Sequence, residues 1–223
     1  MESRDFIRIS AFRHWHPLLS ALQHARFLSS AASVADFPPE AGPELAFAGR
    51  SNVGKSSALN ALAGRRRLAF ASKTPGRTQT INFFALGETG RLADLPGYGH
   101  ASVSQAVRAT WDALIGGYLT GRSTLAGVVL LMDARRPLTA NDRHFLEWLR
   151  PVAAARLVLL SKADKLSRAE RAKALAHTRA SLDRAALSSP VVLFSSKSGE
   201  GVEETRALLD GWLQNKKPPE KGN

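Results

Sequence analysis

Residues Leu45–Ser56 read LAFAGRSNVGKS, and this stretch decides the fold. Four apolar residues precede the pattern G-x-x-x-x-G-K-S, and a helical pattern follows from Lys55. The two glycines let the backbone wrap closely with its N–H groups pointing inward, and the helix adds its positive N-terminal end. The stretch therefore predicts a phosphate-binding loop. In it, Lys55 faces the terminal phosphates and Ser56 offers a hard oxygen ligand to Mg²⁺.

Short apolar runs alternate with helical patterns around this loop, which is typical of an α/β fold. Four runs are apolar throughout, as in buried parallel strands, and two others flank the short connection Gly87–Gly90, as in an antiparallel hairpin. We expect a three-layer fold whose mixed, mostly parallel sheet of six strands is flanked by helices. The parallel strands are 44–49, 127–133, 156–161 and 191–195, the hairpin strands are 80–86 and 91–95, and the helices are 55–63, 102–119, 139–149, 167–187 and 202–213.

The chain has 223 residues, of which 44% are hydrophobic and 22% charged, and this is ordinary globular usage. The length indicates one domain with extensions. We place this single domain at 21–215, between a flexible basic tail at 1–20 and a flexible tail at 216–223. The loops 73–77 and 97–101 contain Gly or Pro and are predicted to be mobile.

Several classes of protein are excluded or disfavoured by composition. The absence of cysteine removes disulfide scaffolds, thiolate metal sites and cysteine nucleophiles. The six histidines lack zinc-like spacing, and Trp111, Trp148 and Trp212 lie in helical patterns as packing residues do. No apolar run approaches the ~20 residues that span a bilayer, and basic residues interrupt every candidate signal peptide near the N-terminus. We therefore expect a cytoplasmic protein without stable membrane insertion.

The net charge is +12, with 31 Lys and Arg against 19 Asp and Glu, which favours a polyanionic partner. Two clusters carry much of it. One is Arg65–Arg67, and the other is the predicted helix with Arg168, Arg171, Lys173, Arg179 and Arg184. Each cluster is either a solvated face or a nucleic-acid surface, and the net charge favours the second interpretation.

Three downstream segments indicate which nucleotide the loop binds. Asp94–Gly97 ends a predicted strand, where the Asp can hold the Mg²⁺ shell and the Gly97 N–H can meet a γ-phosphate. Ser161–Asp164 follows another strand, so that Asp164 can accept the two donors on the edge of guanine, which adenine lacks. Lys162 can lay its aliphatic stem along the base, and Ser195–Lys197 can offer backbone N–H groups to the guanine carbonyl. All segments follow strand ends and should line one crevice.

With these motifs in this order, the chain resembles the P-loop GTPase superfamily and, more narrowly, the EngB (YihA/YsxC) family of bacterial ribosome-biogenesis GTP-binding proteins. The resemblance covers about 25–213. It is carried by the phosphate loop, by KTPGRTQ at 73–79, by Asn82–Phe84, by DLPGYG at 94–99 and by Phe194–Ser196.

The resemblance implies that Gly76–Thr80 is the first switch and that the Thr78 hydroxyl completes the Mg²⁺ shell. From its residues alone the segment is only a polar loop that leads into a strand, and Thr74 is a competing metal ligand. The residue after Asp94–Gly97 is Tyr98, whereas Ras has there a glutamine that orients the attacking water.

Two further positions bear on selectivity and rate. Ser161 replaces the Asn of the common Asn-Lys-x-Asp motif, which leaves guanine selectivity mainly to Asp164. Some related GTPases with Asn at the position of Asn52 bind K⁺ there, so K⁺ is a candidate cofactor beside Mg²⁺, and simple bracing of the loop is the alternative role for Asn52.

The resemblance implies a monomeric, slow, Mg²⁺-dependent GTPase. It would act as a switch in assembly of the large (50S) ribosomal subunit, contacting rRNA and ribosomal proteins, with a role in cell division and septation. The rivals are a P-loop kinase, although an Arg-rich lid is lacking, and a nucleotide-gated division or membrane-surface protein. Asn52, Lys55, Thr78 and Gly97 are the expected catalytic residues, and Ser56 and Thr78 the metal ligands. The expected nucleotide-binding residues are Gly49, Arg50, Ser51, Asn52, Val53, Gly54, Lys55, Ser56, Gly76, Arg77, Thr78, Gln79, Thr80, Asp94, Leu95, Pro96, Gly97, Ser161, Lys162, Ala163, Asp164, Phe194, Ser195 and Ser196.

Overall fold

The computed structural model describes residues 20–69, 80–99 and 105–215, and of 105–108 it describes the backbone only. The predicted tails, apart from Ser20, lie outside these residues, and so does the predicted mobile loop 73–77.

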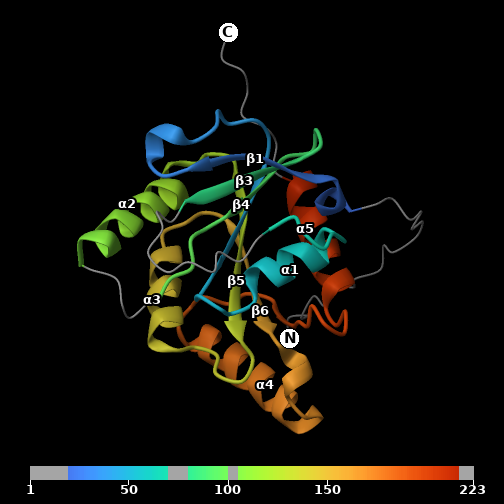
Figure 1. Cartoon of the computed structure of the whole chain (residues 1–223). Coiled ribbons are helices and arrows are strands. Elements are labelled where there is room, and N and C mark those ends of the chain that lie inside the picture. The colour runs from blue at the N-terminus through green and yellow to red at the C-terminus, as the bar shows by residue number, and fades with distance from the viewer. Residues whose placement is uncertain (1–19, 70–79, 100–104, 216–223) are drawn as a thin grey trace, which may run out of the picture.

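A mixed sheet of seven strands forms the centre of the described structure, in the order β1-β3-β4-β2-β5-β6-β7 (Figure 1). The strands are β1 (Ala25–Ala31), β2 (Glu44–Gly49), β3 (Ile81–Leu86), β4 (Arg91–Asp94), β5 (Leu125–Asp133), β6 (Ala155–Ser161) and β7 (Val191–Leu193). Neighbours from β4 to β7 pair in parallel, whereas β3 pairs antiparallel with both β1 and β4. The predicted mixed, mostly parallel sheet and its hairpin are therefore confirmed.

The sheet has one strand more than the six predicted. The additional strand, β1, is an edge strand in which only Ala25 and Ala31 are buried, and its register shifts between Phe27 and Ser29. A strand exposed along its middle shows neither a continuous apolar run nor a regular alternation, so the sequence pattern does not reveal it. It is held instead by pairing with β3 and by an edge-to-face contact between Phe27 and Phe84, whose ring centroids are 5.9 Å apart.

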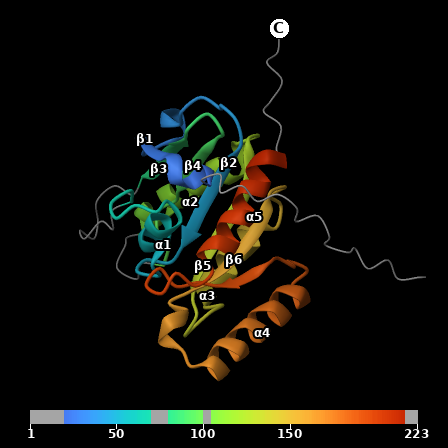
Figure 2. The same cartoon turned by 90° about the vertical axis from the view of Figure 1, so that its right-hand side faces the viewer.

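Helices cover both faces of the sheet and make the three layers. Helices α1 (Lys55–Leu62) and α5 (Val202–Asn215) lie on one face, which is turned to the viewer in Figure 2. Helices α2 (Gln105–Gly121), α3 (Ala140–Leu149) and α4 (Arg168–Arg184) pack on the other. Each face has its own apolar core, because the residues of β2, β5 and β6 alternate between the two sides. No described helix is long and apolar enough to cross a bilayer.

All five predicted helices are present, with ends that differ from the prediction by a few residues. Capping explains two of the starts: Thr139 and Ser167 each form a capping box with an acidic residue three positions later, Asp142 and Glu170. Helix α2 is described from Gln105, so the predicted start at Ser102 lies outside the described residues.

A buried ion network fixes the end of α2 that is remote from the phosphate loop. The Glu44 carboxylate is fully buried, accepts a hydrogen bond from the Tyr118 hydroxyl at 3.0 Å, and pairs with the Arg122 guanidinium. Burial, and then the Glu44 charge, raises the pKa of Tyr118 well above its usual value, so the phenol stays a neutral donor. These contacts join α2 to the first residue of β2, the strand that leads into the phosphate loop.

Close packing of α5 on β5 gives a stability prediction. A Cβ at Gly127 would lie 2.1 Å from the Trp212 ring, whereas a Cβ at Gly116, on α2, would meet nothing within 4 Å. We expect Gly127→Ala to lower the free energy of unfolding by about 1–3 kcal/mol, because the ring must move. Gly116→Ala should raise it by up to about 1 kcal/mol, because alanine is the better helix former. Urea denaturation of both variants measures the difference; equal effects would contradict the packing.

Candidate functional site

Four loops meet at the carboxyl ends of the parallel strands, as the sequence predicts. They follow β2, β4, β6 and β7. Because these strands run in parallel in one sheet, the predicted segments 49–56, 94–97, 161–164 and 194–196 lie at the same edge. A fifth loop, which follows β5, joins them there. Carboxyl ends of parallel strands at the point where the chain order reverses form the usual ligand crevice of open α/β sheets.

The phosphate loop is held by partners outside itself. Its backbone bends through two left-handed residues, Asn52 (φ 64°) and Gly54 (φ 102°), before α1 begins at Lys55. The Ser161 hydroxyl, which is buried, donates to the Val53 carbonyl at 2.7 Å. Ser161 therefore braces the loop directly, although its side chain is shorter than the Asn that commonly occupies this position.

Lys162 crosses the loop from the opposite wall. Its ammonium donates to the Asn52 carbonyl at 2.8 Å and pairs with Asp133 at 3.0 Å. Asp133, which ends β5, is also held by Arg135. Burial opposes ionisation, but hydrogen bonds from Arg135 and Lys162 outweigh it and hold the pKa of Asp133 well below its usual range. The Lys162 ammonium is thereby held between the phosphate loop and the end of β5, and the contact of its stem with a base stays a prediction.

The segment after β4 approaches the phosphate loop so closely that glycine is needed. A Cβ at Gly97 would lie 2.9 Å from the Ser51 hydroxyl and 3.3 Å from its Cα. The neighbouring Tyr98 accepts a hydrogen bond from Ser51 N at 3.1 Å and donates to the Gly49 carbonyl at 3.3 Å, which forms a parallel bridge. The loop and the segment Gly97–Gly99 are thus paired backbone to backbone.

The residues around Lys55 fit a magnesium ion bound with a nucleotide. The Lys55 ammonium pairs with the Asp94 carboxylate, which is buried at the end of β4. The Ser56 hydroxyl is half-buried in the first turn of α1 and has no hydrogen bond with another described residue. Hydroxyl and carboxylate oxygens are the donors that Mg²⁺ prefers, and the described residues hold no cluster of three His, Cys or acidic side chains. This donor set fits an ion that takes most of its ligands from phosphates and water.

Asp164 is oriented by Ser195. The buried Ser195 hydroxyl donates to the Asp164 carboxylate at 2.8 Å and accepts from the backbone N–H groups of Lys197 and Ser198 at 3.2 Å. The Ser195 hydrogen bond is the main cause that lowers the pKa of Asp164, so its carboxylate is ionised at neutral pH. Ala163 N donates to the Phe194 carbonyl at 3.1 Å, which links the two segments. The side chain of Ser195 therefore has a role that the sequence analysis gave only to its backbone.

A single buried carboxylate joins Tyr98 to α3. Asp142 accepts from the Tyr98 hydroxyl at 2.9 Å and forms an ion pair with Arg50 at 3.3 Å, while its other oxygen caps α3 at Thr139. Burial, reinforced by the Asp142 charge, raises the pKa of Tyr98 above its usual value, so the phenol remains a donor. The Tyr98 ring stacks on Phe145, with centroids 5.0 Å apart.

The structure thus brings the predicted segments 49–56, 94–97, 161–164 and 194–196 to one edge of the sheet. Gly76–Gln79, with the predicted ligand Thr78 and its rival Thr74, lie outside the described residues, and Thr80 is the one residue of that segment that is described. The sequence analysis missed Asp133, Arg135 and Asp142. Asp133 was detectable, because it ends a predicted buried strand at the same edge of the sheet, whereas nothing in the spacing distinguishes Asp142 from an ordinary helix cap.

Comparisons with known proteins agree with this geometry. The family model described as "50S ribosome-binding GTPase" matches residues 44–162. A probable GTP-binding protein EngB from Dechloromonas aromatica is 50% identical over 211 residues, which cover 90% of this chain and 96% of that protein. The protein of the same name from Thiobacillus denitrificans is 53% identical over 193 residues, or 86% of this chain and 92% of its own length.

Solved structures show the same fold. A probable GTP-binding protein EngB superposes with a TM-score of 0.59 at 23% identity, covering 77% of this chain and 98% of its own. Era in complex with MgGDPNP and a fragment of 16S ribosomal RNA gives a TM-score of 0.60 at 18% identity, covering 82% of this chain and 59% of its own. The two EngB proteins are about 50% identical to this chain over most of its length, and the family model matches the part that contains the phosphate loop. The chain therefore belongs to the EngB family of GTP-binding proteins, with the P-loop GTPase fold.

Proposed function

We propose that this protein binds GTP and GDP with Mg²⁺, hydrolyses GTP slowly, and acts as a switch in assembly of the large ribosomal subunit. One observation carries the nucleotide part of the proposal: Lys162, two residues before Asp164, donates to the Asn52 carbonyl. This bond sets the base-recognition segment and the phosphate loop at a fixed separation. A ligand that fills both must therefore carry a base and a phosphate chain together, as a nucleotide does.

Each described residue takes its role from its position. The loop backbone from Gly49 to Gly54 receives the phosphates, and Lys55 leaves its pairing with Asp94 to meet them. Ser56 is a metal ligand, with Asp94 behind it holding the Mg²⁺ shell. Asp164, held ionised by Ser195, accepts the two donors of the guanine edge.

Tyr98 stands at the position where Ras has its water-orienting glutamine. Its hydroxyl donates to Asp142 and its ring lies against Phe145, so in this arrangement the hydroxyl proton is not available to orient an attacking water. Hydrolysis therefore needs another source of charge stabilisation. The Asn52 side chain is exposed and forms no hydrogen bond with another described residue, while its carbonyl does the bracing through Lys162. We therefore propose that Asn52 holds K⁺ against the phosphates, with Thr78 completing the Mg²⁺ shell. Mg²⁺, with K⁺ where it is bound, would offset the charge that develops on the phosphates.

The ribosomal part of the proposal rests on family membership and on charge. The family model that matches is described as a ribosome-binding GTPase, and the chain carries a net charge of +12. Arg65–Arg67 are exposed after α1. We accordingly propose a cytoplasmic monomer that docks on rRNA and ribosomal proteins of the 50S subunit and that is needed for normal cell division and septation.

Guanine selectivity should depend on Asp164. Asp164→Asn replaces an acceptor pair by one acceptor and one donor, so we expect GTP affinity to fall by about 100-fold and xanthosine triphosphate to bind in its place. Calorimetry with GTP, ATP and xanthosine triphosphate measures this, with Asp183→Asn, an exposed carboxylate on α4, as the matched control. A wild type that binds ATP as tightly as GTP would overturn the assignment.

Potassium dependence tests the role of Asn52. If K⁺ supplies the missing charge stabilisation, turnover in KCl should exceed turnover in matched NaCl by about tenfold or more. Asn52→Ala should remove this difference while GDP affinity stays within about threefold, since the bracing of the loop uses the backbone carbonyl. Steady-state phosphate release gives the rates. The same rate in both salts for the wild type would take K⁺ out of the mechanism.

Docking on ribosomes should depend on both nucleotide and salt. We expect more protein to sediment with large subunits when it is loaded with a non-hydrolysable GTP analogue than with GDP. Binding should fall by about tenfold or more between 50 and 200 mM salt, because Lys and Arg contacts to phosphates release counterions. Arg65–Arg67→Glu, or reversal at Arg168 and Arg171, should flatten that dependence, whereas Arg150→Glu, at the C-cap of α3 and outside both clusters, should not.

The contrary results are specific. Equal binding in the GTP-analogue and GDP states would refute the switch. Binding that does not change with salt concentration would indicate that the protein contacts a ribosomal protein and not RNA. Flotation of the protein with anionic liposomes, without sedimentation on ribosomes, would favour the membrane-surface alternative.

A further inference from the structure

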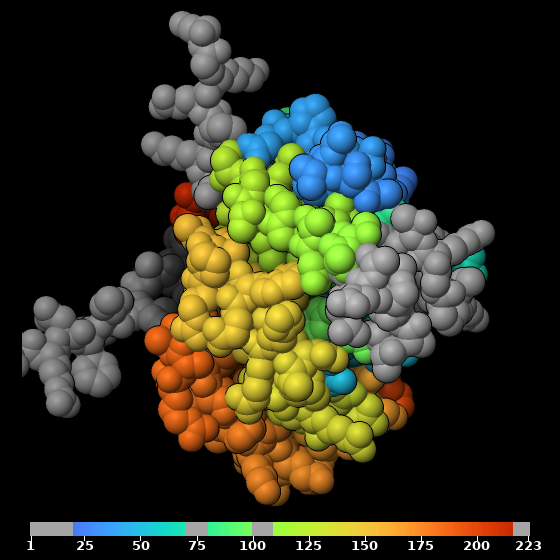
Figure 3. Space-filling model, turned by 90° about the vertical axis from the view of Figure 1, so that its left-hand side faces the viewer, coloured from blue at the N-terminus to red at the C-terminus, as the bar shows by residue number. Residues whose placement is uncertain are grey.

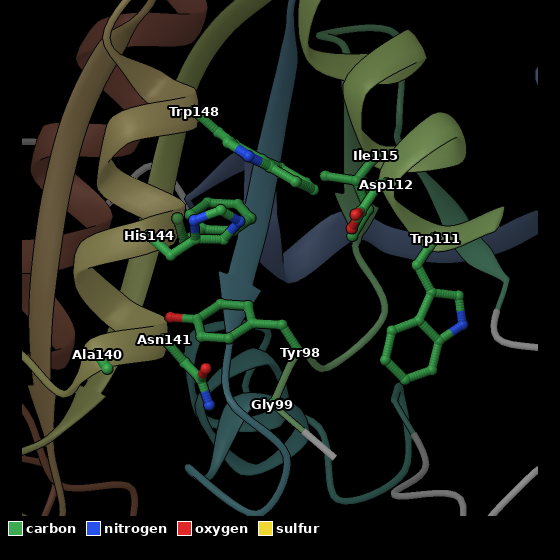
Figure 4. A pocket seen from close by; sticks show the side chains of 10 residues that line it. Tyr98, Gly99, Trp111, Asp112, Ile115, Ala140, Asn141, His144 and Trp148 are labelled. Atoms are coloured by element: carbon green, nitrogen blue, oxygen red, sulfur yellow. The ribbon is translucent and has the colours of Figure 1, made fainter. Parts of the chain in front are cut away.

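A pocket of about 560 Å³ lies between α2 and α3, outside the crevice described above. Figure 3 shows the face where the green atoms of α2 meet the yellow atoms of α3. The volume is within the range of about 300–1,000 Å³ that small-ligand sites occupy. Figure 4 shows the walls: Asp112 and Ile115 come from α2, His144 and Trp148 come from α3, and Tyr98 lies between the two helices.

The pocket is unusual in its charge. Its described lining is mainly aromatic and aliphatic, with Trp148 beside Phe145 at a centroid distance of 6.2 Å. Asp112 is the one charged side chain among the lining residues that the structure describes. Among the residues that the structure describes, this carboxylate has no ion-pair partner. The described lining residues include no Lys or Arg, although the chain carries a net charge of +12.

These features specify the chemistry of a ligand. The carboxylate of Asp112 repels the phosphates of a nucleic acid. A purely apolar ligand would cover the walls of the pocket but would supply no counter-charge to this carboxylate. A Lys or Arg side chain satisfies both parts of the pocket: its stem packs on the apolar walls, and its cationic head reaches the carboxylate and the face of an indole ring. Of the two, Arg fits better, because the planar guanidinium can stack on Trp148 and donate to Asp112 at once.

We propose that the α2–α3 pocket binds an arginine side chain of a protein partner, with Asp112 as its counter-charge and Trp148 as its stacking surface. The partner is thus recognised by a basic peptide segment. The basic clusters at Arg65–Arg67 and on α4 lie outside this pocket and remain the candidate surfaces for a polyanion such as RNA.

The position of Tyr98 ties the pocket to the nucleotide site. Tyr98 lines the pocket and stacks on Phe145, while its backbone is bridged to Gly49 and Ser51 of the phosphate loop. A γ-phosphate that attracts the Gly97 N–H must therefore shift a residue of the pocket wall. The affinity of the pocket should depend on the bound nucleotide, and this coupling, unlike the pocket itself, rests on the proposed function.

The test uses the full-length, ¹⁵N-labelled protein and a short peptide, N-acetyl-Leu-Arg-Leu amide. Its counterpart carries citrulline, a neutral group of the same shape, in place of Arg. The indole N–H signal of Trp148, assigned with Trp148→Phe, reports on the pocket, and that of Trp212, which packs on Gly127 under α5, is an internal reference. We expect saturable shifts at Trp148, and at Trp111 where the peptide reaches that wall of the pocket, but none at Trp212, with citrulline binding about fivefold more weakly or worse.

Matched variants separate charge from fold. Asp112→Asn should reduce the affinity for the Arg peptide to that for the citrulline peptide, whereas Glu204→Gln, an exposed carboxylate on α5, should leave it unchanged. Equal binding of the Arg and citrulline peptides, no shift up to 10 mM peptide, or saturable shifts with adenosine instead of the peptide would each overturn the proposal. Adenosine binding would identify a nucleobase pocket.

The coupling is measured in the same spectra by comparing protein without nucleotide, with GDP and with a GTP analogue. We expect peptide affinities to differ by at least about threefold between the last two states. If the nucleotides bind at the phosphate loop and the peptide affinity does not change, the coupling is wrong and the proposed function stands. If no guanine nucleotide binds, the proposed function fails while the peptide result still decides the pocket.

Discussion

The backbone of the phosphate loop depends on hydrogen-bond partners outside itself. Between Gly49 and Gly54 the chain is neither strand nor helix, so its polar groups have no regular ladder to satisfy them. Three neighbours supply the partners: Tyr98 pairs with Gly49 and Ser51, Ser161 with Val53, and Lys162 with Asn52. The N–H groups that a phosphate chain needs can point inward because the carbonyls are held from behind.

These partners come from different strands, and this explains why the whole sheet is required. Tyr98 follows β4, while Ser161 and Lys162 follow β6, and the register of the parallel pairs brings their ends level with the end of β2. β5 lies between β2 and β6 and supplies Asp133, which fixes Lys162 from its other side. Any shift of register in these strands would move a partner of the loop by a residue, so the geometry of the loop depends on the register of the sheet.

The parts that the sequence predicts well are those with a strong local pattern. The phosphate loop, the four buried parallel strands, the hairpin and the five helices all follow from glycine spacing or apolar periodicity. The exposed edge strand β1 could not be predicted, because long-range pairing with β3 holds it and its own pattern does not. Asp142 shows the same limit within the site: its spacing from Thr139 predicts a helix cap, and only the folded chain brings Arg50 and Tyr98 to its other oxygen.

That second role of Asp142 separates two kinds of chemistry on the molecule. By accepting from Tyr98, the carboxylate keeps the phenol on the α3 side, where it forms part of an apolar wall with Phe145. The nucleotide crevice on the other side of the same segment is left to Lys55, Asp94 and the loop backbone. One residue of the Gly97–Gly99 segment thus lies toward each environment: Gly97 lies against Ser51 of the phosphate loop, and Tyr98 lines the α2–α3 pocket. Because their backbones are adjacent, a displacement of Gly97 is passed directly to Tyr98, and this short connection is what the proposed coupling between nucleotide and arginine requires.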